Sequence, residues 1–320
     1  MEKHDVTRRQ ILMGATLGVT GVTGGSVASA GMAAPPAKTG DASRPTICFF
    51  SKHLPDLNYP ELARALKDFG FPGVDLTVRP KGHVLPENVE RDLPQAVEAL
   101  RAEGIAIPMI TTGLTSAGDP AARPTLYTAA KLGVPLYKLG YYRYGDLTKL
   151  DETLGRIKRE VESLAAMGRH AGIQGGFHTH SGNSVGAVMW DNWWIQRDVD
   201  PRWMSYYFDP CHATIEGGLW GWKVGYQRLA DRITMVSIKD FYWEKRNGEW
   251  EIRWCPLGEG MVRFPEFFQM LAADRFRGPL SLHVEYEIEG STEAARHEKT
   301  MAAIAKDLAF LKKQVQTAFG

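Results

Sequence analysis

Two histidines stand one residue apart in the stretch GFHTHSGN, at the end of an apolar run that predicts a buried strand over residues 173–180. Side chains at positions i and i+2 of a strand point to the same face, so His178 and His180 are expected to face one place. A neutral imidazole binds a divalent metal ion or accepts a proton at neutral pH. The pair therefore predicts a metal site or an acid–base site, with a crowded corner of the core as the structural alternative.

Other residues able to do chemistry follow apolar runs in the same way. They are Arg79, Lys81 and His83 in TVRPKGHV, Asp209 and His212 in DPCH, Lys239 and Asp240 in SIKD, and His283 and Glu285 in SLHVEYE. One histidine at a strand end is more often a hydrogen-bonded structural residue than a ligand. Together, however, these residues would crowd the C-terminal ends of several strands, which in a barrel meet at one mouth.

The apolar runs alternate with stretches of helical periodicity, and this alternation predicts the fold. The runs expected to be strands cover residues 46–51, 73–78, 105–111, 135–142, 173–180, 204–210, 233–240 and 279–287. Strand–helix units in this order predict an α/β fold, a parallel sheet closed into a single-domain (β/α)8 TIM barrel. An open doubly wound sheet is the alternative, but FFSKHLPDLNY after the first strand lacks the glycine-rich turn of dinucleotide-binding folds.

The stretch FYWEKRNGEWEIRW interrupts the alternation after the seventh strand. Its residues alternate around Asn247-Gly248, a pair preferred in tight hairpin turns. We therefore predict a β-hairpin insertion between the seventh strand and the helix that follows it.

The N-terminal segment has the features of an export signal. The twin arginine Arg8-Arg9 precedes an apolar, glycine-rich run and a small-residue stretch with an Ala-x-Ala that ends at Ala30, which is typical of a Tat-type signal peptide. An uncleaved membrane anchor is the alternative, although the run is short for a span. We predict a signal peptide over 1–30, a disordered linker over 31–45 and the barrel over 46–316, in a periplasmic or secreted protein.

Composition limits the partners of the chain. Its 38 Lys and Arg residues nearly balance 37 Asp and Glu residues, so no basic surface for nucleic acid is indicated. No segment after the signal is long and apolar enough to span a membrane. The 3 cysteines form no CxxC pattern and are odd in number, which argues against a disulfide framework. We expect a small-molecule partner, no nucleic acid, no membrane contact after signal cleavage, and a possible homo-oligomer.

Carboxylates and imidazoles at one barrel mouth favour a divalent metal ion such as Mn, Mg, Co or Zn. Asp209 and His212 could approach one ion if the chain turns out of the strand after Asp209. His283 and Glu285 share one face of the last strand by the same rule as the first histidine pair. His283 is then either a ligand itself or a partner that orients Glu285.

The order of these motifs resembles the xylose isomerase-like TIM-barrel superfamily. The motifs are His-x-His on the fifth strand, DPCH on the sixth, IKD on the seventh, PLGEG before the last helix, and GPLSLHVEY on the eighth. The resemblance covers most of the chain, from about residue 46 to 310. The group includes sugar phosphate isomerases and epimerases, ketose 3-epimerases, inosose dehydratases and endonuclease IV.

The resemblance implies a divalent ion held by an acidic residue on the fifth strand, Asp on the sixth, His on the seventh and Glu on the eighth. In this chain Asp209 and Glu285 match the sixth-strand and eighth-strand ligands, and His178 stands where the fifth-strand acid is usual. Ser237 replaces the seventh-strand histidine. Either the ion is re-ligated by nearby imidazoles or the metal has been lost. We favour re-ligation and expect His178, Asp209 and Glu285 as ligands.

The resemblance also implies proton abstraction next to a carbonyl, with the ion stabilising the oxygens of an enediolate. We expect Lys239, His180 and His212 as the catalytic acid–base residues. A Lys239 that stays charged and pairs with Asp240 is the structural alternative. The residues expected to bind substrate are Arg79, His83, Trp190, Asp240 and His283.

Tryptophan gives a clue to the substrate, because all 9 tryptophans fall between residues 190 and 254. Indole faces pack well against sugar rings, so a cluster near the mouth favours a carbohydrate. Packing between helices or an oligomer interface is the alternative, and we assign about half of the tryptophans to it. Export favours a sugar without phosphate, since phosphosugars are scarce outside the cytoplasm.

These observations lead to one leading function and two alternatives. We predict a metal-dependent isomerase or epimerase of a non-phosphorylated carbohydrate or keto sugar, acting through an enediolate. A lyase or hydratase that acts on a 3-keto sugar or glycoside by the same proton abstraction is the first alternative. A non-catalytic sugar-binding protein is the second, and a nuclease of the endonuclease IV type fits poorly with the nearly neutral charge.

Overall fold

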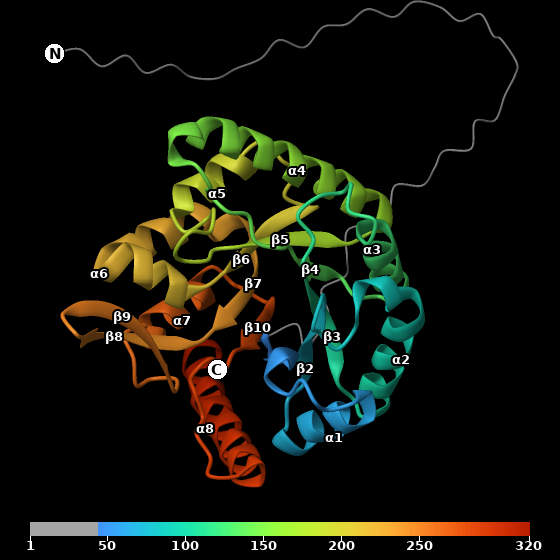
Figure 1. Cartoon of the computed structure of the whole chain (residues 1–320), viewed down its shortest axis with the longest axis vertical. Coiled ribbons are helices and arrows are strands. Elements are labelled where there is room, and N and C mark those ends of the chain that lie inside the picture. Colours follow the sequence, from blue (N-terminus) through green and yellow to red (C-terminus); the bar gives the residue numbers. More distant parts are fainter. Residues whose placement is uncertain (1–43) are drawn as a thin grey trace, which may run out of the picture. The chain divides into compact units, whose positions relative to one another are not determined.

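A computed structural model describes residues 44–320 as a closed barrel of parallel strands with helices outside it (Figure 1). Around the barrel the strand order is β1, β10, β7, β6, β5, β4, β3, β2. The strands are β1 (Thr46–Phe50), β2 (Gly73–Val78), β3 (Ala106–Thr112), β4 (Leu136–Lys138), β5 (Gln174–His178), β6 (Met204–Phe208), β7 (Ile233–Ile238) and β10 (Pro279–Leu282).

Helices form the outer layer around these strands, as Figure 1 shows. They are α1 (Tyr59–Phe69), α2 (Val89–Ala102), α3 (Ala122–Lys131), α4 (Leu150–Ala171), α5 (Met189–Gln196), α6 (Pro210–Leu229), α7 (Phe264–Ala273) and α8 (Glu293–Phe319). The predicted TIM barrel is confirmed, and the open doubly wound sheet is wrong because β1 pairs with both β2 and β10.

The predicted hairpin consists of β8 (Asp240–Arg246) and β9 (Glu249–Cys255), which pair antiparallel. Asn247 and Gly248 join the two strands with φ values of 52° and 88°. Both values lie in the left-handed region that a type I′ turn needs and that Asn and Gly tolerate best. The turn chemistry of this dipeptide therefore explains why the segment leaves the barrel as a hairpin.

The helix ends follow from local sequence, as α1 illustrates. The Asn58 side chain accepts a hydrogen bond from the Glu61 backbone amide, and the Glu61 carboxylate accepts one from the Asn58 amide, each at 3.0 Å. This reciprocal pair satisfies two amides that the first helical turn leaves without a partner. At the other end, Gly70 stops the helix with φ at 76°.

Alternating residues of the strands divide the apolar core into two parts. Met109, Leu136, Tyr207 and Met235 form a small cluster, whereas their immediate neighbours Ile110, Tyr137, Phe208 and Val236 belong to the large cluster beneath the helices. Because strand neighbours face opposite sides, the small cluster lies inside the barrel. The interior is thus filled at its base, and polar groups are left to occupy the C-terminal mouth.

Six of the eight predicted strands are shorter than expected, and in β5 and β10 this affects the site. β5 ends at His178 and β10 ends at Leu282, so His180, His283 and Glu285 lie just beyond the strands. The predicted signal peptide and most of the predicted linker lie outside the described residues. Within residues 44–320 no helix is both long and apolar enough to cross a membrane.

We predict that Gly278→Ala destabilises the barrel. A Cβ on Gly278, just before β10, would overlap the carbonyl oxygen of Thr234 next to it on β7. Relief requires a shift of a central strand, so the free energy of unfolding should fall by roughly 1–3 kcal/mol or more in denaturant titrations.

Gly221→Ala is the matched control for this substitution. Gly221 lies in α6, and a Cβ there has nothing within 4 Å. Alanine favours helix over glycine, so the control should unfold at the same or a slightly higher denaturant concentration. Equal unfolding free energies for the two variants would contradict the packing explanation.

Candidate functional site

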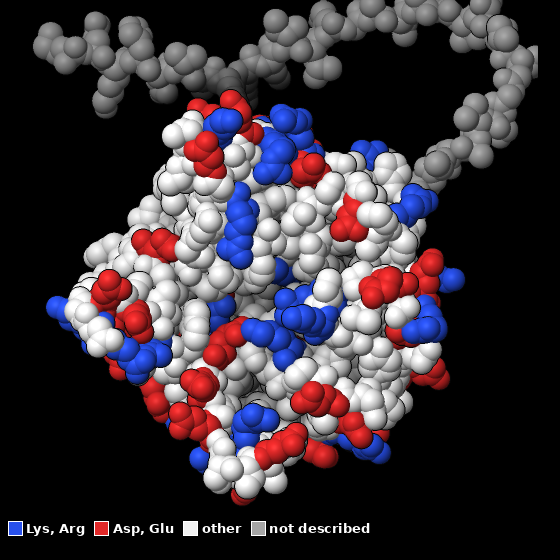
Figure 2. All heavy atoms as spheres, viewed as in Figure 1, with Lys and Arg blue, Asp and Glu red and all other residues white. Residues whose placement is uncertain are grey.

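A cavity of ≈ 230 Å³ opens at the C-terminal ends of the strands. Figure 2 shows basic side chains gathered around a hollow at the centre of the barrel, with an acidic group beside them. Many residues that the sequence singled out line this cavity, together with aromatic residues on its walls. The lining consists of Phe50, Lys52, Arg79, Thr111, Tyr141, His180, His212, Lys239, Trp254, His283 and Glu285.

Asp209, at the junction of β6 and α6, is fully buried below this cavity and binds several groups at once. Its Oδ1 atom accepts a hydrogen bond from the His212 backbone amide at 3.0 Å and so caps the start of α6. Its Oδ2 atom accepts one from the Ser237 hydroxyl at 2.5 Å and lies 3.1 Å from the Lys239 Nζ atom. One carboxylate thus joins the first turn of a helix to the end of β7.

Charge pairing keeps this buried carboxylate ionised. Burial alone would raise the pKa of Asp209, but Lys239, His212 and His178 hold that pKa well below its usual range. Burial likewise would lower the pKa of Lys239, yet the Asp209 carboxylate leaves it above the ordinary lysine value. The two side chains therefore form a charged pair in the barrel interior, where each ion depends on the other.

His178 uses both of its ring nitrogens in hydrogen bonds. Nε2 lies 3.2 Å from Asp209 Oδ2, and Nδ1 lies 3.2 Å from the Tyr141 hydroxyl. A carboxylate can only accept, so Nε2 carries the hydrogen and Nδ1 accepts from Tyr141. Burial holds the pKa of His178 well below its usual value, so the ring is neutral. In this arrangement neither nitrogen has a free lone pair.

His180 presents the opposite situation at the cavity wall. Its Nδ1 atom donates to the Ser181 carbonyl oxygen at 2.9 Å, so the Nε2 atom of the neutral ring carries a lone pair. Burial, assisted by the nearby Lys239 ammonium, lowers the pKa of His180 to about 4. The ring of His212 lies against it, with ring centroids 3.8 Å apart. Nδ1 of His212 shares a hydrogen bond of 2.7 Å with the Ser181 hydroxyl.

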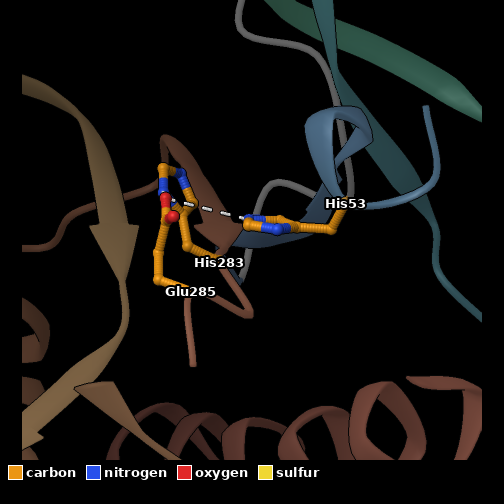
Figure 3. Close-up of side chains that lie close together, drawn as sticks. All are labelled: His53, His283 and Glu285. Atoms are coloured by element: carbon orange, nitrogen blue, oxygen red, sulfur yellow. Dashed lines mark ion pairs between the residues drawn. The ribbon is translucent and has the colours of Figure 1, made fainter. Parts of the chain in front are cut away.

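A second group lies on the opposite wall, where the chain leaves β1 and β10 (Figure 3). His283 Nδ1 lies 3.5 Å and His53 Nε2 lies 3.9 Å from Glu285 Oε1. Burial lowers the pKa of His283 to about 4 and that of His53 to about 3. Burial would raise the pKa of Glu285, but the adjoining imidazoles and Lys239 hold it below its usual range.

Comparison with protein families agrees with this architecture. Residues 63–314 match the model of a family described as xylose isomerase-like TIM barrels. The chain belongs to this family. The predicted resemblance to the superfamily is therefore confirmed over most of the barrel.

Several solved structures share the barrel fold of this xylose isomerase-like protein. An L-ribulose 3-epimerase is 17% identical, with a TM-score of 0.65 over 86% of this chain and 95% of the other. The 3-keto-D-glucoside 4-epimerase of E. coli is 15% identical, with a TM-score of 0.62 over 84% and 100%. A probable 3-DHS dehydratase of Bacillus anthracis is 14% identical, with a TM-score of 0.59 over 83% and 98%. Among curated protein sequences there is no match.

The structure of this family member divides the ligand set that the sequence predicts. His178 and Asp209 lie together with His212, whereas Glu285 belongs to a group with His53 and His283. In the first group both nitrogens of His178 are engaged, and Asp209 Oδ2 already contacts Lys239 and Ser237. The set His178, Asp209 and Glu285 therefore does not fit one ion in this arrangement.

The residues predicted to bind substrate also separate into two classes. Arg79 and His283 line the cavity. His83 instead donates from Nε2 to the Leu54 carbonyl oxygen at 3.1 Å and shares a hydrogen bond with Thr77, so it ties two loops together. Trp190 lies half exposed on α5 beside Trp193, and neither belongs to the cavity lining.

Asp240, the fifth residue of that prediction, binds backbone rather than substrate. Its carboxylate accepts hydrogen bonds from backbone amides of Phe241, Gly258, Gly260 and Val262 at 2.8 to 3.1 Å. These bonds tie the loop after β9 to the base of the hairpin. The alternative in which Lys239 pairs with Asp240 is wrong, because the Lys239 ammonium lies against Asp209.

The tryptophan cluster is spread over several environments rather than forming one wall. Trp203 and Trp222 are buried, and Trp220 and Trp250 are mostly exposed. Trp254, at the end of β9, lines the cavity, where the Lys239 Nζ atom lies 5.3 Å from its ring centroid. The hairpin therefore brings one indole face to the site, which the clustering in sequence could not specify.

Sequence reasoning missed several residues of the site. Lys138 of β4 is 2% exposed, and its Nζ atom lies 3.4 Å from the ring centroid of Tyr141. Asp75 of β2 is buried and accepts hydrogen bonds from the hydroxyls of Thr111 and Ser281. A charged residue inside an otherwise apolar strand, as in GVDLTV and PLYKLGYY, was the signal that could have found both. His53 follows β1 with no such signal.

We predict that Lys239→Met strongly destabilises the protein because it leaves the Asp209 charge buried without its partner. Side chains of Asp209 and Lys239 are 0% and 5% exposed. Removing one member of such a pair typically costs about 3–5 kcal/mol. The free energy of unfolding in urea should fall accordingly, and the double variant Lys239→Met/Asp209→Asn should recover part of the loss.

Arg202→Met serves as the control, since Arg202 forms an exposed pair with Asp200. An exposed pair contributes little because water and salt screen it, so the unfolding midpoint should stay unchanged. A double variant no more stable than Lys239→Met alone would show that the Asp209 charge is not the cause.

Proposed function

We propose that this chain is an enzyme that isomerises or epimerises a non-phosphorylated carbohydrate by moving a proton next to a carbonyl group. The observation that carries the proposal is the convergence of a free imidazole lone pair, a fixed ammonium and a carboxylate on one cavity, contributed by His180, Lys239 and Glu285. Such a set can remove a proton and stabilise the negative charge that forms as the proton leaves.

His180 is the proposed base. Its Nε2 lone pair belongs to a ring that lines the cavity and whose tautomer is set by the Ser181 carbonyl. Burial and the Lys239 ammonium keep the ring neutral near pH 7, which leaves it able to accept a proton from a carbon acid. The His212 ring is tilted against that of His180 and hydrogen-bonds Ser181, so His212 is the proposed group that exchanges protons with solvent or with a second carbon.

Lys239 is the proposed electrostatic partner of the developing oxyanion. Its ammonium stays charged because Asp209 balances it, and its ring contact with Trp254 restricts its position. A positive charge fixed before the reaction stabilises an enediolate oxygen without reorganisation. A divalent ion, when bound at the mouth, would add Lewis-acid stabilisation of the same oxygens, and Glu285 is the carboxylate of the lining that could hold it.

The walls of the cavity favour a sugar. Trp254, Tyr141 and Phe50 offer aromatic faces, and Arg79 and Thr111 offer donors for hydroxyl groups. The names of the structural neighbours agree with this class, since two are sugar 3- or 4-epimerases. Another neighbour is named as a dehydratase, so elimination of a β-hydroxyl or glycosyl group from the same enediolate is the second candidate reaction.

We predict that His180→Asn slows proton exchange on the substrate. Incubation of the purified protein with ketohexoses and a 3-ketoglucoside in D2O, followed by NMR, measures exchange of the C–H next to the carbonyl. Loss of the base should reduce the exchange rate about 10²–10⁴-fold. His170→Asn, on an exposed helix position, is the control and should exchange like the wild type.

Products of the same incubation separate the candidate functions. Exchange with an intact carbon skeleton supports isomerisation or epimerisation, whereas loss of water or of a glycosyl group supports the lyase. Wild-type protein that binds these sugars without any exchange would overturn the enzymatic proposal in favour of a sugar-binding protein.

We also propose export to the periplasm by the Tat route, on the basis of the N-terminal sequence alone. Replacing Arg8 and Arg9 by lysine keeps the charge and removes the guanidinium pair that marks such signals. The double variant should remain in the cytoplasm at full length, whereas the wild type should appear in the periplasmic fraction, shortened after Ala30. Equal periplasmic amounts of both would contradict the Tat assignment.

A further inference from the structure

The group of His53, His283 and Glu285 has two buried nitrogens that lack hydrogen-bond partners. They are Nε2 of His53 and Nδ1 of His283, and both face the same oxygen, Glu285 Oε1. Ligand atoms of the three residues all lie within 4.8 Å of one another. Figure 3 shows His53 reaching this point from the segment after β1, while His283 and Glu285 come from the end of β10.

Inside the barrel His283 forms hydrogen bonds through Nε2, whereas its Nδ1 atom faces Glu285. His283 Nε2 lies 3.2 Å from the Ser281 hydroxyl, whose own hydrogen is donated to Asp75 Oδ2 at 2.8 Å. The Tyr207 hydroxyl lies 3.1 Å from the same nitrogen. Nε2 therefore either accepts a hydrogen bond from Tyr207 or donates one to Ser281, and the second tautomer leaves Nδ1 without a hydrogen. In that tautomer Nδ1 carries a lone pair 3.5 Å from Glu285 Oε1 and is able to bind a metal ion.

In the tautomer with the hydrogen on Nε2, Nδ1 and Glu285 Oε1 are two electron-rich atoms facing each other, and they repel unless a cation lies between them. Glu285 Oε2 has such a cation, because it accepts from the Lys52 ammonium at 2.6 Å. Glu285 Oε1 has none within hydrogen-bond distance among the described residues, and both imidazole nitrogens aim at it. The arrangement is that of a cation site with a carboxylate oxygen and two nitrogens as donors.

We propose that His53, His283 and Glu285 bind a divalent transition-metal ion on the wall of the cavity. Two imidazoles with one carboxylate favour borderline ions such as Zn²⁺, Co²⁺ or Fe²⁺ over Mg²⁺, which prefers oxygen donors. Phe50 stacks on the His283 ring with centroids 4.2 Å apart and restricts the orientation of that ring. The remaining coordination positions face the cavity that His283 and Glu285 line, where substrate oxygens could bind.

The role of this ion in the reaction rests on the proposed function. Binding of the ion, however, can be measured without any substrate turnover. It also accounts for the Ser237 replacement in this chain. The Lys239 ammonium occupies the position beside Asp209 that a metal ion would otherwise take. The metal ion binds instead to His53, His283 and Glu285 on the other wall of the cavity.

The test is Co²⁺ binding to chelator-treated protein, followed by visible absorption and by elemental analysis after gel filtration. The wild type should bind one equivalent and develop the absorption bands of cobalt with nitrogen and oxygen ligands. His53→Ala and Glu285→Gln should each weaken binding by more than about 100-fold, since even outer partners of a metal ligand account for 10–100-fold. Glu285→Gln keeps the side-chain shape, so it separates lost ligation from lost folding.

Two further variants test whether the ion binds to this group and not to the other histidine group. His178→Asn, in the other histidine group, and His170→Ala, an exposed histidine on α4, should both keep wild-type affinity for Co²⁺. Loss of binding in His178→Asn with retention in His53→Ala would overturn the proposal, as would wild-type protein that binds no Co²⁺. Metal binding as proposed without any C–H exchange would leave this site intact and reject the enzymatic function instead.

Discussion

The ion pair between Asp209 and Lys239 is the interaction on which the rest of the site depends. One oxygen of the Asp209 carboxylate caps α6. The other contacts His178, Ser237 and Lys239, which come from the ends of β5 and β7, the strands on either side of β6. A charge buried this deeply is tolerated only when it is paired with an opposite charge and hydrogen-bonded. The pair therefore fixes the geometry of β5, β6 and β7 at the mouth, and with it the position of the ammonium beside the cavity.

Charge is distributed unequally across the cavity, and this decides what each wall can do. On the Asp209 side the negative charge is balanced inside the protein, so the wall presents a fixed ammonium and a free imidazole lone pair. On the Glu285 side two buried imidazole nitrogens without a hydrogen-bond partner face one carboxylate oxygen. The first wall is suited to proton transfer and oxyanion stabilisation, and the second to an external cation.

The hairpin after β7 contributes to the site through packing rather than through a motif. Asp240 binds the backbone amides of the loop after β9, which holds that loop against the base of the hairpin. Trp254 is thereby placed with its ring near the Lys239 ammonium and the His212 imidazole. An insertion that looks peripheral in the chain thus supplies an aromatic face to the cavity.

The sequence by itself determined the barrel, because periodic apolar runs and glycine stops are local signals that every strand–helix unit repeats. It also placed His180, His212, Lys239 and Glu285 at the mouth, since strand ends of a parallel barrel converge. Only the tertiary structure decided the pairing: Lys239 with Asp209 rather than Asp240, and Glu285 with His53 rather than His178. Those choices depend on side-chain reach and hydrogen-bond capacity between strands distant in sequence, which no local pattern encodes.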